Sequence, residues 1–310
     1  MAVFSLPFHH NDLPLGSKVF KSQLVTEVKS TDMKGIWELK IRHVIVGTPQ
    51  QRKLDFEESY SPIIDPTSFR LHICLACGSN HICGIIDISN AFQNTIGKAE
   101  DRIYVSLPPG YLEWARLQLG FKSERGEKYY VQMFNSYQGT KDAGNRWYTL
   151  ITSVIEQFGF IRCHVDHAYF VKHIGDNNYI YLSLATDDIF VSCKSYAIFD
   201  DIVQYMRQFF ELTTQTGSVL KFLGLRIIQS NHAISLNQGE YVFDMLCHYF
   251  GKEVDHVKTL NAPMRYDGDY EKELADALPL TEAELKKSIV KYKGTYRFWT
   301  GKLMFLNTQT

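Results

Sequence analysis

Three aspartates at the ends of strand-like apolar runs are the residues of this sequence best suited to chemistry. Asp187 and Asp188 are adjacent and interrupt the run "LSLATDDIFVS". Asp87 follows the apolar residues of "ICGIIDIS". Taking an ionised carboxylate out of water without a partner is strongly unfavourable. Three carboxylates at strand ends therefore need a partner of opposite charge.

A divalent cation is the partner that this arrangement favours. Neighbouring strand residues point to opposite faces, so Asp187 and Asp188 share a region only if the chain turns there. Apolar runs on both sides predict a tight hairpin, and Asp87 ends another strand. Clustered carboxylates raise one another's pKa, and their hard oxygen atoms suit Mg²⁺. Two such ions about 4 Å apart can catalyse phosphoryl transfer. The alternative is structural, because Asp is common in turns.

The surrounding pattern predicts the elements that position these acids. Alternation over residues 18–47, with Lys34 and Gly35 at the turn, predicts a hairpin, and "PTSFRLHICLACG" predicts a helix. We also expect a hairpin over 221–238 with its turn at 230–232. Further helices are predicted over 145–160, 197–212 and beyond 238, and further strands over 168–173, 179–185 and 189–193. Together, these elements predict an α+β fold with an antiparallel sheet and helices on one face.

Composition excludes few classes of protein. The chain has 310 residues, 45% of them hydrophobic, and a net charge of −1 from 33 basic and 34 acidic residues. A local basic groove is invisible in such a sum, so nucleic-acid binding stays open. The N-terminus lacks the pattern of a secretory signal, and no apolar run is long enough to predict a membrane span. The six scattered cysteines are expected to be reduced thiols in an intracellular compartment.

Six segments, in order along the chain, resemble the reverse transcriptase of copia-type LTR retrotransposons. No single segment is specific, but six in the right order are. The segments are "ELKIRHVIVGTPQQRKLDFEESYSPI", "DISNAFQN", "YQGTKDAGNRWY", "YLSLATDDIFVS", "KFLGLRI" with "ISLNQGEYVFDML", and "YRFWTGKLMFLNTQT".

The resemblance implies a right-hand polymerase with fingers, palm and thumb. The implied regions are fingers 14–64 and 95–142, palm 65–94 and 143–238 (with the primer-grip hairpin), and thumb 239–310. We expect a polymerase region without an RNase H domain, because the chain stops soon after the thumb segment.

The resemblance also implies the metal ligands. Asp87 and Asp187 would hold two Mg²⁺ ions, with Mn²⁺ as an alternative. Asp188 would complete the catalytic triad, and the carbonyl of Ile88 would be a further ligand.

Five residues are implied to bind the incoming dNTP. Lys40 and Arg42 would clamp its triphosphate, Phe92 would be the gate that excludes a ribose, and Gln138 and Gly139 would pack on the new base pair. Each has a plainer alternative. The two basic residues could form a solvated strand face, Phe92 could be ordinary core, and Gln138 could be a loop amide.

The primer grip is implied at Phe222, Leu223 and Gly224. The chain departs from the family pattern at three places near the implied site. Tyr137-Gln138-Gly139-Thr140-Lys141 stands where the family has Leu-Tyr-Gly-Leu-Lys. Val46 replaces a second arginine of the fingers segment, and Ala185-Thr186 replaces a Tyr-Val pair before the two aspartates.

The implied function is RNA-directed DNA polymerase, extending a primer 3′-hydroxyl with dNTPs on an RNA or DNA template. A homodimer or other parts of a polyprotein are further candidate partners, and no membrane is implied. The implied location is the cytoplasm, including a virus-like particle, or the nucleus. One alternative is a degenerate, non-catalytic nucleic-acid-binding module that kept the fold.

A second alternative is a zinc-dependent binding module. "HICLACGSNHIC" contains a Cys-x-x-Cys pair, Cys74 and Cys77, with His72, His81 and Cys83 nearby. A second such pair at zinc-finger spacing is missing from the sequence, and free cysteine on an apolar helix face behaves as a small hydrophobe. Elemental analysis for zinc would separate this alternative from the other two.

Overall fold

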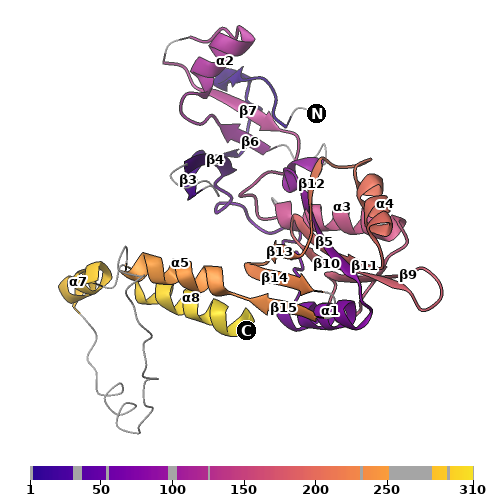
Figure 1. The fold of residues 1–310 in the computed structure, drawn as a ribbon. Helices are drawn as coiled ribbons and strands as arrows, with labels where there is room; N and C mark the ends of the chain where they lie inside the picture. The colour runs from indigo at the N-terminus through magenta and orange to yellow at the C-terminus, as the bar shows by residue number, and fades with distance from the viewer. Residues whose placement is uncertain are drawn as a thin grey trace. The chain divides into compact units, whose positions relative to one another are not determined.

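The computed structural model describes residues 3–30, 37–53, 56–96, 103–124, 126–230, 233–250, 281–291 and 294–309. The chain forms two compact units, residues 1–215 and 216–310, which are treated separately below. Figure 1 shows the helices and strands of both units. Among the helices described, none is long and apolar enough to cross a membrane.

A six-stranded sheet is the centre of the first unit. Its strand order is β12-β5-β11-β10-β9-β8, and the neighbours from β5 to β8 pair antiparallel. In β10 every residue after Tyr179 is buried, as expected for a strand covered on both faces. The strands are β5 Ile82–Ile88, β8 Ile161–Arg162, β9 Tyr169–His173, β10 Tyr179–Ala185, β11 Asp188–Cys193 and β12 Leu212–Thr216.

Helix α1 (Pro66–Gly78) covers one face of this sheet. Its N-cap Asp65 accepts a hydrogen bond from the backbone N–H of Thr67 (2.8 Å), and Pro66 suits the first turn. The helix has the bounds that its sequence predicts. On the sheet side, the Phe69 ring meets Phe190 edge-on with centroids 5.2 Å apart.

Helix α4 (Tyr196–Met206) covers the opposite face. A Cβ at Gly84 of β5 would lie 2.5 Å from the Phe199 ring of α4, so only glycine fits there. Gly84 pairs with Val191, whereas Phe190, under α1, points the other way because strand residues alternate. The expectation that helices lie on one face only is therefore wrong. The third long helix of this unit, α3 (Ala143–Gln157), buries Trp147 and Ile151 completely.

A buried polar network joins α1 to the two central strands. His72 is fully buried, with Nδ1 2.7 Å from Ser183 Oγ on β10 and Nε2 2.9 Å from Ser192 Oγ on β11. Burial, with a smaller effect of His81, lowers the pKa of His72 from 6.5 to about 3, so the ring is neutral. Because both ring nitrogens are occupied, His72 is not available to a metal ion. The zinc alternative thus loses one of its candidate ligands.

Two smaller sheets complete the first unit. A four-stranded sheet has the order β1-β7-β6-β2, and a long two-stranded sheet pairs β3 with β4 antiparallel, as the predicted first hairpin requires. The turn at Lys34 and Gly35 lies outside the described residues. The elements are β1 Phe8–His9, η1 His10–Asp12, β2 Val19–Phe20, β3 Ser22–Ser30, β4 Trp37–Ile45, η2 Ala91–Asn94, β6 Ile103–Ser106, α2 Tyr111–Leu119 and β7 Tyr129–Met133.

Among its described residues, the second unit holds a three-stranded antiparallel sheet, β13-β14-β15, and three helices. The sequence predicted one hairpin over 221–238, but this region belongs to two. The first turns at Leu223–Gly224, and the second joins Ser230 to Ala233 through residues outside the described range. The elements are β13 Val219–Phe222, β14 Leu225–Ser230, β15 Ala233–Asn237, α5 Gly239–Phe250, α7 Glu282–Lys291 and α8 Tyr296–Gln309.

The neutral, buried His72 predicts a pH dependence of stability. In the unfolded chain this imidazole takes up a proton below pH 6.5, whereas in the folded chain it does so only near pH 3. The free energy of unfolding therefore falls as pH drops below 6.5, by at most about 1.4 kcal/mol per pH unit from this group. In His72→Gln, an amide can still bond a serine hydroxyl but does not titrate. We expect a flatter pH dependence of its urea unfolding between pH 7 and 5.

His164→Gln, at an exposed position, is the matched control and should keep the wild-type pH dependence. Equal pH dependence in His72→Gln and wild type would show that His72 does not remain neutral in the fold.

Candidate active site

The three aspartates come together at one end of the central sheet. β10 and β11 are joined by a two-residue turn, Thr186–Asp187, closed by the pair Ala185 and Asp188. Asp188 lies directly opposite Asp87 on β5. The backbone N–H of Ile88 donates to the carbonyl of Asp187 at 3.0 Å, which ties the turn to the end of β5. The hairpin and the cluster therefore agree with the sequence prediction.

The environment disfavours the charged forms of Asp187 and Asp188. Burial, reinforced by Asp87 and then Asp187, raises the pKa of Asp188 from 3.8 to about 6. Burial also raises the pKa of Asp187, with Asp87 adding to the effect. The three groups offer only oxygen atoms, and their mutual repulsion favours a cation beside them. In the chemistry of their donor atoms, these residues suit a hard divalent cation.

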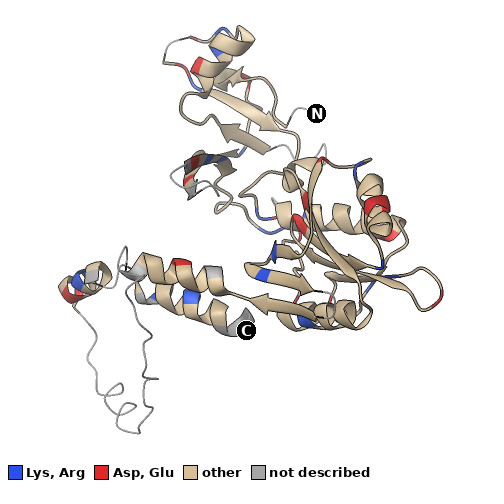
Figure 2. Ribbon diagram, viewed as in Figure 1, with Lys and Arg blue, Asp and Glu red and all other residues tan. Residues whose placement is uncertain are grey.

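The basic face of the two-stranded sheet lies within electrostatic reach of this cluster. Lys40 and Arg42 share one face of β4, and both lower the pKa of Asp187, against the larger effect of burial. Arg42 Nη1 donates to Glu27 Oε2 on β3 at 2.7 Å. Figure 2 shows basic and acidic residues side by side on β3 and β4. The role of Lys40 and Arg42 in binding a triphosphate stays a prediction.

Gln138 and Gly139 pack backbone to backbone on the end of β4. The N–H of Ile45 donates to the Gln138 carbonyl at 2.9 Å. Gly139 has φ +97°, and a Cβ there would lie 2.0 Å from the Ile45 carbonyl oxygen. Lys141 extends the contact: its N–H donates to Gln50 Oε1 and its ammonium to the Gln50 carbonyl. The Gln-Gly segment therefore joins the strand that carries Lys40 and Arg42.

Phe92 lies in the short helix η2 that follows β5. Asn90, with φ +52°, turns the chain, and the Phe92 carbonyl accepts from Thr95 Oγ1 at 2.7 Å. The Phe92 side chain is half-buried rather than fully buried. The role of Phe92 as a gate beside the nucleotide sugar stays a prediction.

The predicted primer-grip residues belong to the second unit. Phe222 is buried, and Leu223 and Gly224 form a two-residue turn with φ of +51° and +73°. Two positive φ values suit the right-handed twist of a hairpin. The role of these three residues stays a prediction.

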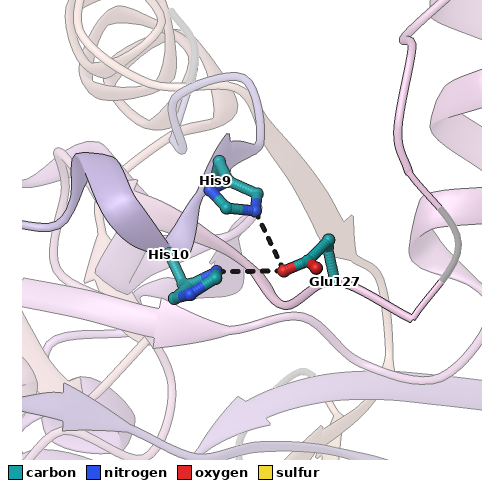
Figure 3. A group of neighbouring side chains, drawn as sticks. All are labelled: His9, His10 and Glu127. Carbon is teal, nitrogen blue, oxygen red and sulfur yellow. Dashed lines mark hydrogen bonds and ion pairs between the residues drawn. The ribbon is translucent and has the colours of Figure 1, made fainter.

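A second group of potential metal ligands lies beside η1. His9 Nε2 and His10 Nδ1 are 3.1 and 3.4 Å from the same oxygen, Oε2 of Glu127 (Figure 3). However, His9 Nδ1 accepts the N–H of Asn11 at 3.2 Å. The proton of a neutral His9 is therefore on Nε2, where it is donated to Glu127. Metal binding would need a bare nitrogen there, so we describe the group as a hydrogen-bonded cluster.

A family model described as reverse transcriptase (RNA-dependent DNA polymerase) matches residues 7–264. The chain belongs to this reverse transcriptase family.

Curated relatives of this reverse transcriptase chain come from plant transposons. The chain is 25% identical over 251 residues to the retrovirus-related Pol polyprotein from transposon TNT 1-94 of Nicotiana tabacum, covering 80% of the chain and 18% of that protein. It is 26% identical over 207 residues to the corresponding polyprotein from transposon RE1 of Arabidopsis thaliana, covering 67% and 13%. These relatives confirm the copia-type resemblance. The chain spans less than a fifth of each.

A solved structure of a foamy viral protease-reverse transcriptase in complex with double-stranded DNA also matches. The match covers 72% of the present chain and 33% of the chain in that structure, at 11% identity and a TM-score of 0.35. At that score the comparison supports no further argument.

Two contacts at the reverse transcriptase site were not foreseen from the sequence. Trp147 of α3 donates its indole N–H to the carbonyl of Thr186 at 2.6 Å. Thr213 of β12 has its hydroxyl 3.5 Å from Asp87 Oδ2. A buried tryptophan needs an acceptor for its N–H, which is a signal in the sequence, but the identity of the acceptor depends on the tertiary fold.

Asp188 predicts a stability change that depends on pH and metal. Its pKa of about 6 in the fold, against 3.8 ordinarily, means that the folded state keeps a proton which the unfolded state loses between these values. Stability therefore falls as pH rises from about 4 to 6, and the loss persists above pH 6. We expect metal-free Asp188→Asn to melt at a higher temperature than wild type at pH 8, with the gap closing near pH 4.

Asp201→Asn, an exposed acid on α4, is the control and should show no such gap. Melting curves in a chelator at pH 4.5 and 8 decide the point. A wild-type protein as stable as Asp188→Asn at pH 8 would contradict the raised pKa.

Proposed function

We propose that this chain is an RNA-directed DNA polymerase that adds dNTPs to a primer 3′-hydroxyl by metal-assisted phosphoryl transfer. The observation that carries the proposal is the cluster of Asp87, Asp187 and Asp188 at one end of the sheet, with the pKa of two of them raised. Membership of the reverse transcriptase family supports the same function. Template, primer and dNTPs are the proposed partners.

The carboxylates would hold divalent cations, Mg²⁺ first among them and Mn²⁺ as an alternative. Asp87 and Asp187 are the proposed ligands of both ions, with Asp188 and the carbonyl of Ile88 beside them. Bound Mg²⁺ would activate the primer hydroxyl and neutralise the charge of the leaving pyrophosphate. The aspartates themselves need no proton transfer for this role, since they bind and orient.

Lys40 and Arg42 would bind the triphosphate on the side opposite the aspartates and their metal ions. Their charges already act on Asp187. A triphosphate bound between this basic face and the aspartates would therefore interact with Lys40 and Arg42 and with the metal ions held by the aspartates. The Glu27 carboxylate pairs with the Arg42 guanidinium at 2.7 Å. This ion pair is exposed and therefore weak, so a triphosphate can displace the Glu27 carboxylate.

The remaining predicted residues would shape the nucleotide pocket. Gln138 and Gly139 would form a surface for the new base pair, because their backbone is fixed against β4. Phe92 would stand beside the sugar. The fingers, palm and thumb boundaries and the primer grip at Phe222, Leu223 and Gly224 are proposed as the sequence predicts them.

Primer extension on an RNA template with Mg²⁺ and dNTPs tests the function directly. We expect Asp87→Asn and Asp187→Asn each to lower the extension rate by about a hundredfold or more, since catalysis here depends on positioning. Binding of the template–primer should hardly change, because phosphate contacts elsewhere supply most of it. Asp201→Asn is the control and should extend normally.

An Asp87→Asn protein with near-normal extension would remove the proposed role of the cluster. Wild-type protein that binds template–primer but never extends it would favour the alternative, a nucleic-acid-binding module that kept the fold without activity.

Phe92 predicts sugar selectivity. A rigid ring beside the sugar leaves no room for a 2′-hydroxyl, and overlap in a packed site costs about 1–3 kcal/mol, or roughly 5- to 150-fold per step. We expect Phe92→Val to raise CTP relative to dCTP incorporation by about tenfold or more. Overall rate should fall less than in the aspartate variants, because no metal ligand is lost.

Phe158→Val removes a half-buried ring of the same size at the end of α3 and serves as the control. It should leave the CTP/dCTP ratio unchanged. If Phe92→Val lowers melting temperature and rate together with a constant ratio, Phe92 is core packing instead.

A further inference from the structure

The turn that carries Asp187 has an unfavourable backbone conformation. Thr186, its first residue, has φ +55°. A β-branched side chain is rarely found at positive φ, because its Cβ crowds the backbone. Such a conformation persists only where the surroundings hold it. Some contact must therefore stabilise this turn against relaxing to negative φ.

Trp147 of helix α3 makes that contact. Its indole Nε1 donates to the Thr186 carbonyl at 2.6 Å, and its side chain has no exposed surface. The ring of Phe210 packs against the indole at 5.3 Å and 71°. Trp147 is also one turn inside a long helix, α3, so its position is rigid.

The accepting carbonyl belongs to the peptide unit that enters Asp187. A peptide is planar, so fixing the direction of the Thr186 carbonyl also fixes the N–H and Cα of Asp187. On the other side of Asp187, the carbonyl accepts from the N–H of Ile88. Both peptide planes around the Asp187 Cα are thus held, one from α3 and one from β5.

We infer that Trp147 is a positioning residue for Asp187: its indole N–H holds the Thr186–Asp187 peptide in the orientation in which the Asp187 carboxylate binds a divalent cation. The inference rests on the proposed function for the identity of the ligand, but its geometry is independent of polymerase activity. A purely packing role would depend on the volume of the indole ring and not on its N–H.

Mn²⁺ binding by the full chain tests the inference without nucleic acid. Mn²⁺ is titrated into metal-free protein and the free ion is followed by electron paramagnetic resonance. Loss of a hydrogen bond that orients a metal ligand weakens metal binding by about 10- to 100-fold. We therefore expect Trp147→Phe to raise the Mn²⁺ dissociation constant by about tenfold or more. The smaller ring and the lost hydrogen bond also lower its melting temperature, so a second destabilised variant is needed for comparison.

Two further variants separate positioning from packing. Phe210→Leu removes the ring that packs on Trp147 and keeps the N–H, so it should lower the melting temperature and leave Mn²⁺ affinity unchanged. Thr186→Gly adopts positive φ without strain. Added to Trp147→Phe, it should recover part of the lost Mn²⁺ affinity, because the turn then keeps its shape without the indole.

Several results would overturn the inference. Wild-type Mn²⁺ affinity in Trp147→Phe would do so, and so would a parallel loss of affinity and melting temperature in Trp147→Phe and Phe210→Leu. Absence of Mn²⁺ binding by wild type, or full binding by Asp187→Asn, would also overturn it. Failure of the polymerase assay with the expected Mn²⁺ results would contradict the proposed function alone and leave the role of Trp147 supported.

Discussion

Mutual repulsion of three carboxylates at one end of a sheet is the constraint on which the rest of this fold depends. Asp87 and Asp188 lie directly opposite each other on antiparallel strands, where like charges are destabilising. The sheet beneath them offsets this with strands that are apolar on both faces and covered by α1 on one side and α4 on the other. The stability of this core allows an arrangement that by itself would spread apart.

The same constraint explains the connections around the site. Lys40 and Arg42 can act on the cluster only if their long two-stranded sheet is held at its base. The Ile45–Gln138 hydrogen bond and the close approach of Gly139 to Ile45 provide that hold. A side chain at Gly139 would separate the two segments. Gly139 thus helps to position the strand that carries Lys40 and Arg42, in addition to its proposed place in the nucleotide pocket.

Local patterns made part of this structure predictable. The Asp pair between apolar runs gave the hairpin, and a Pro-led apolar repeat gave α1 with its bounds, because turn and cap chemistry act over a few residues. Tertiary features were missed. Strand β12 reads as polar, the turn at Leu223–Gly224 needs a leucine at positive φ, and the second covered sheet face follows from packing at Gly84. No local pattern encodes these.

The departure at Ala185-Thr186 takes on a different meaning in the fold. Position 186 contributes its carbonyl oxygen, which accepts the indole N–H of Trp147 and depends on no particular side chain. Thr186 is half-buried, so its hydroxyl can reach water. Ala185 is buried and pairs with Asp188 through the backbone. The substituted side chains thus lie outside the interactions that orient Asp187. What the turn requires is an acceptor facing α3 and a donor on β5, and this sequence supplies both.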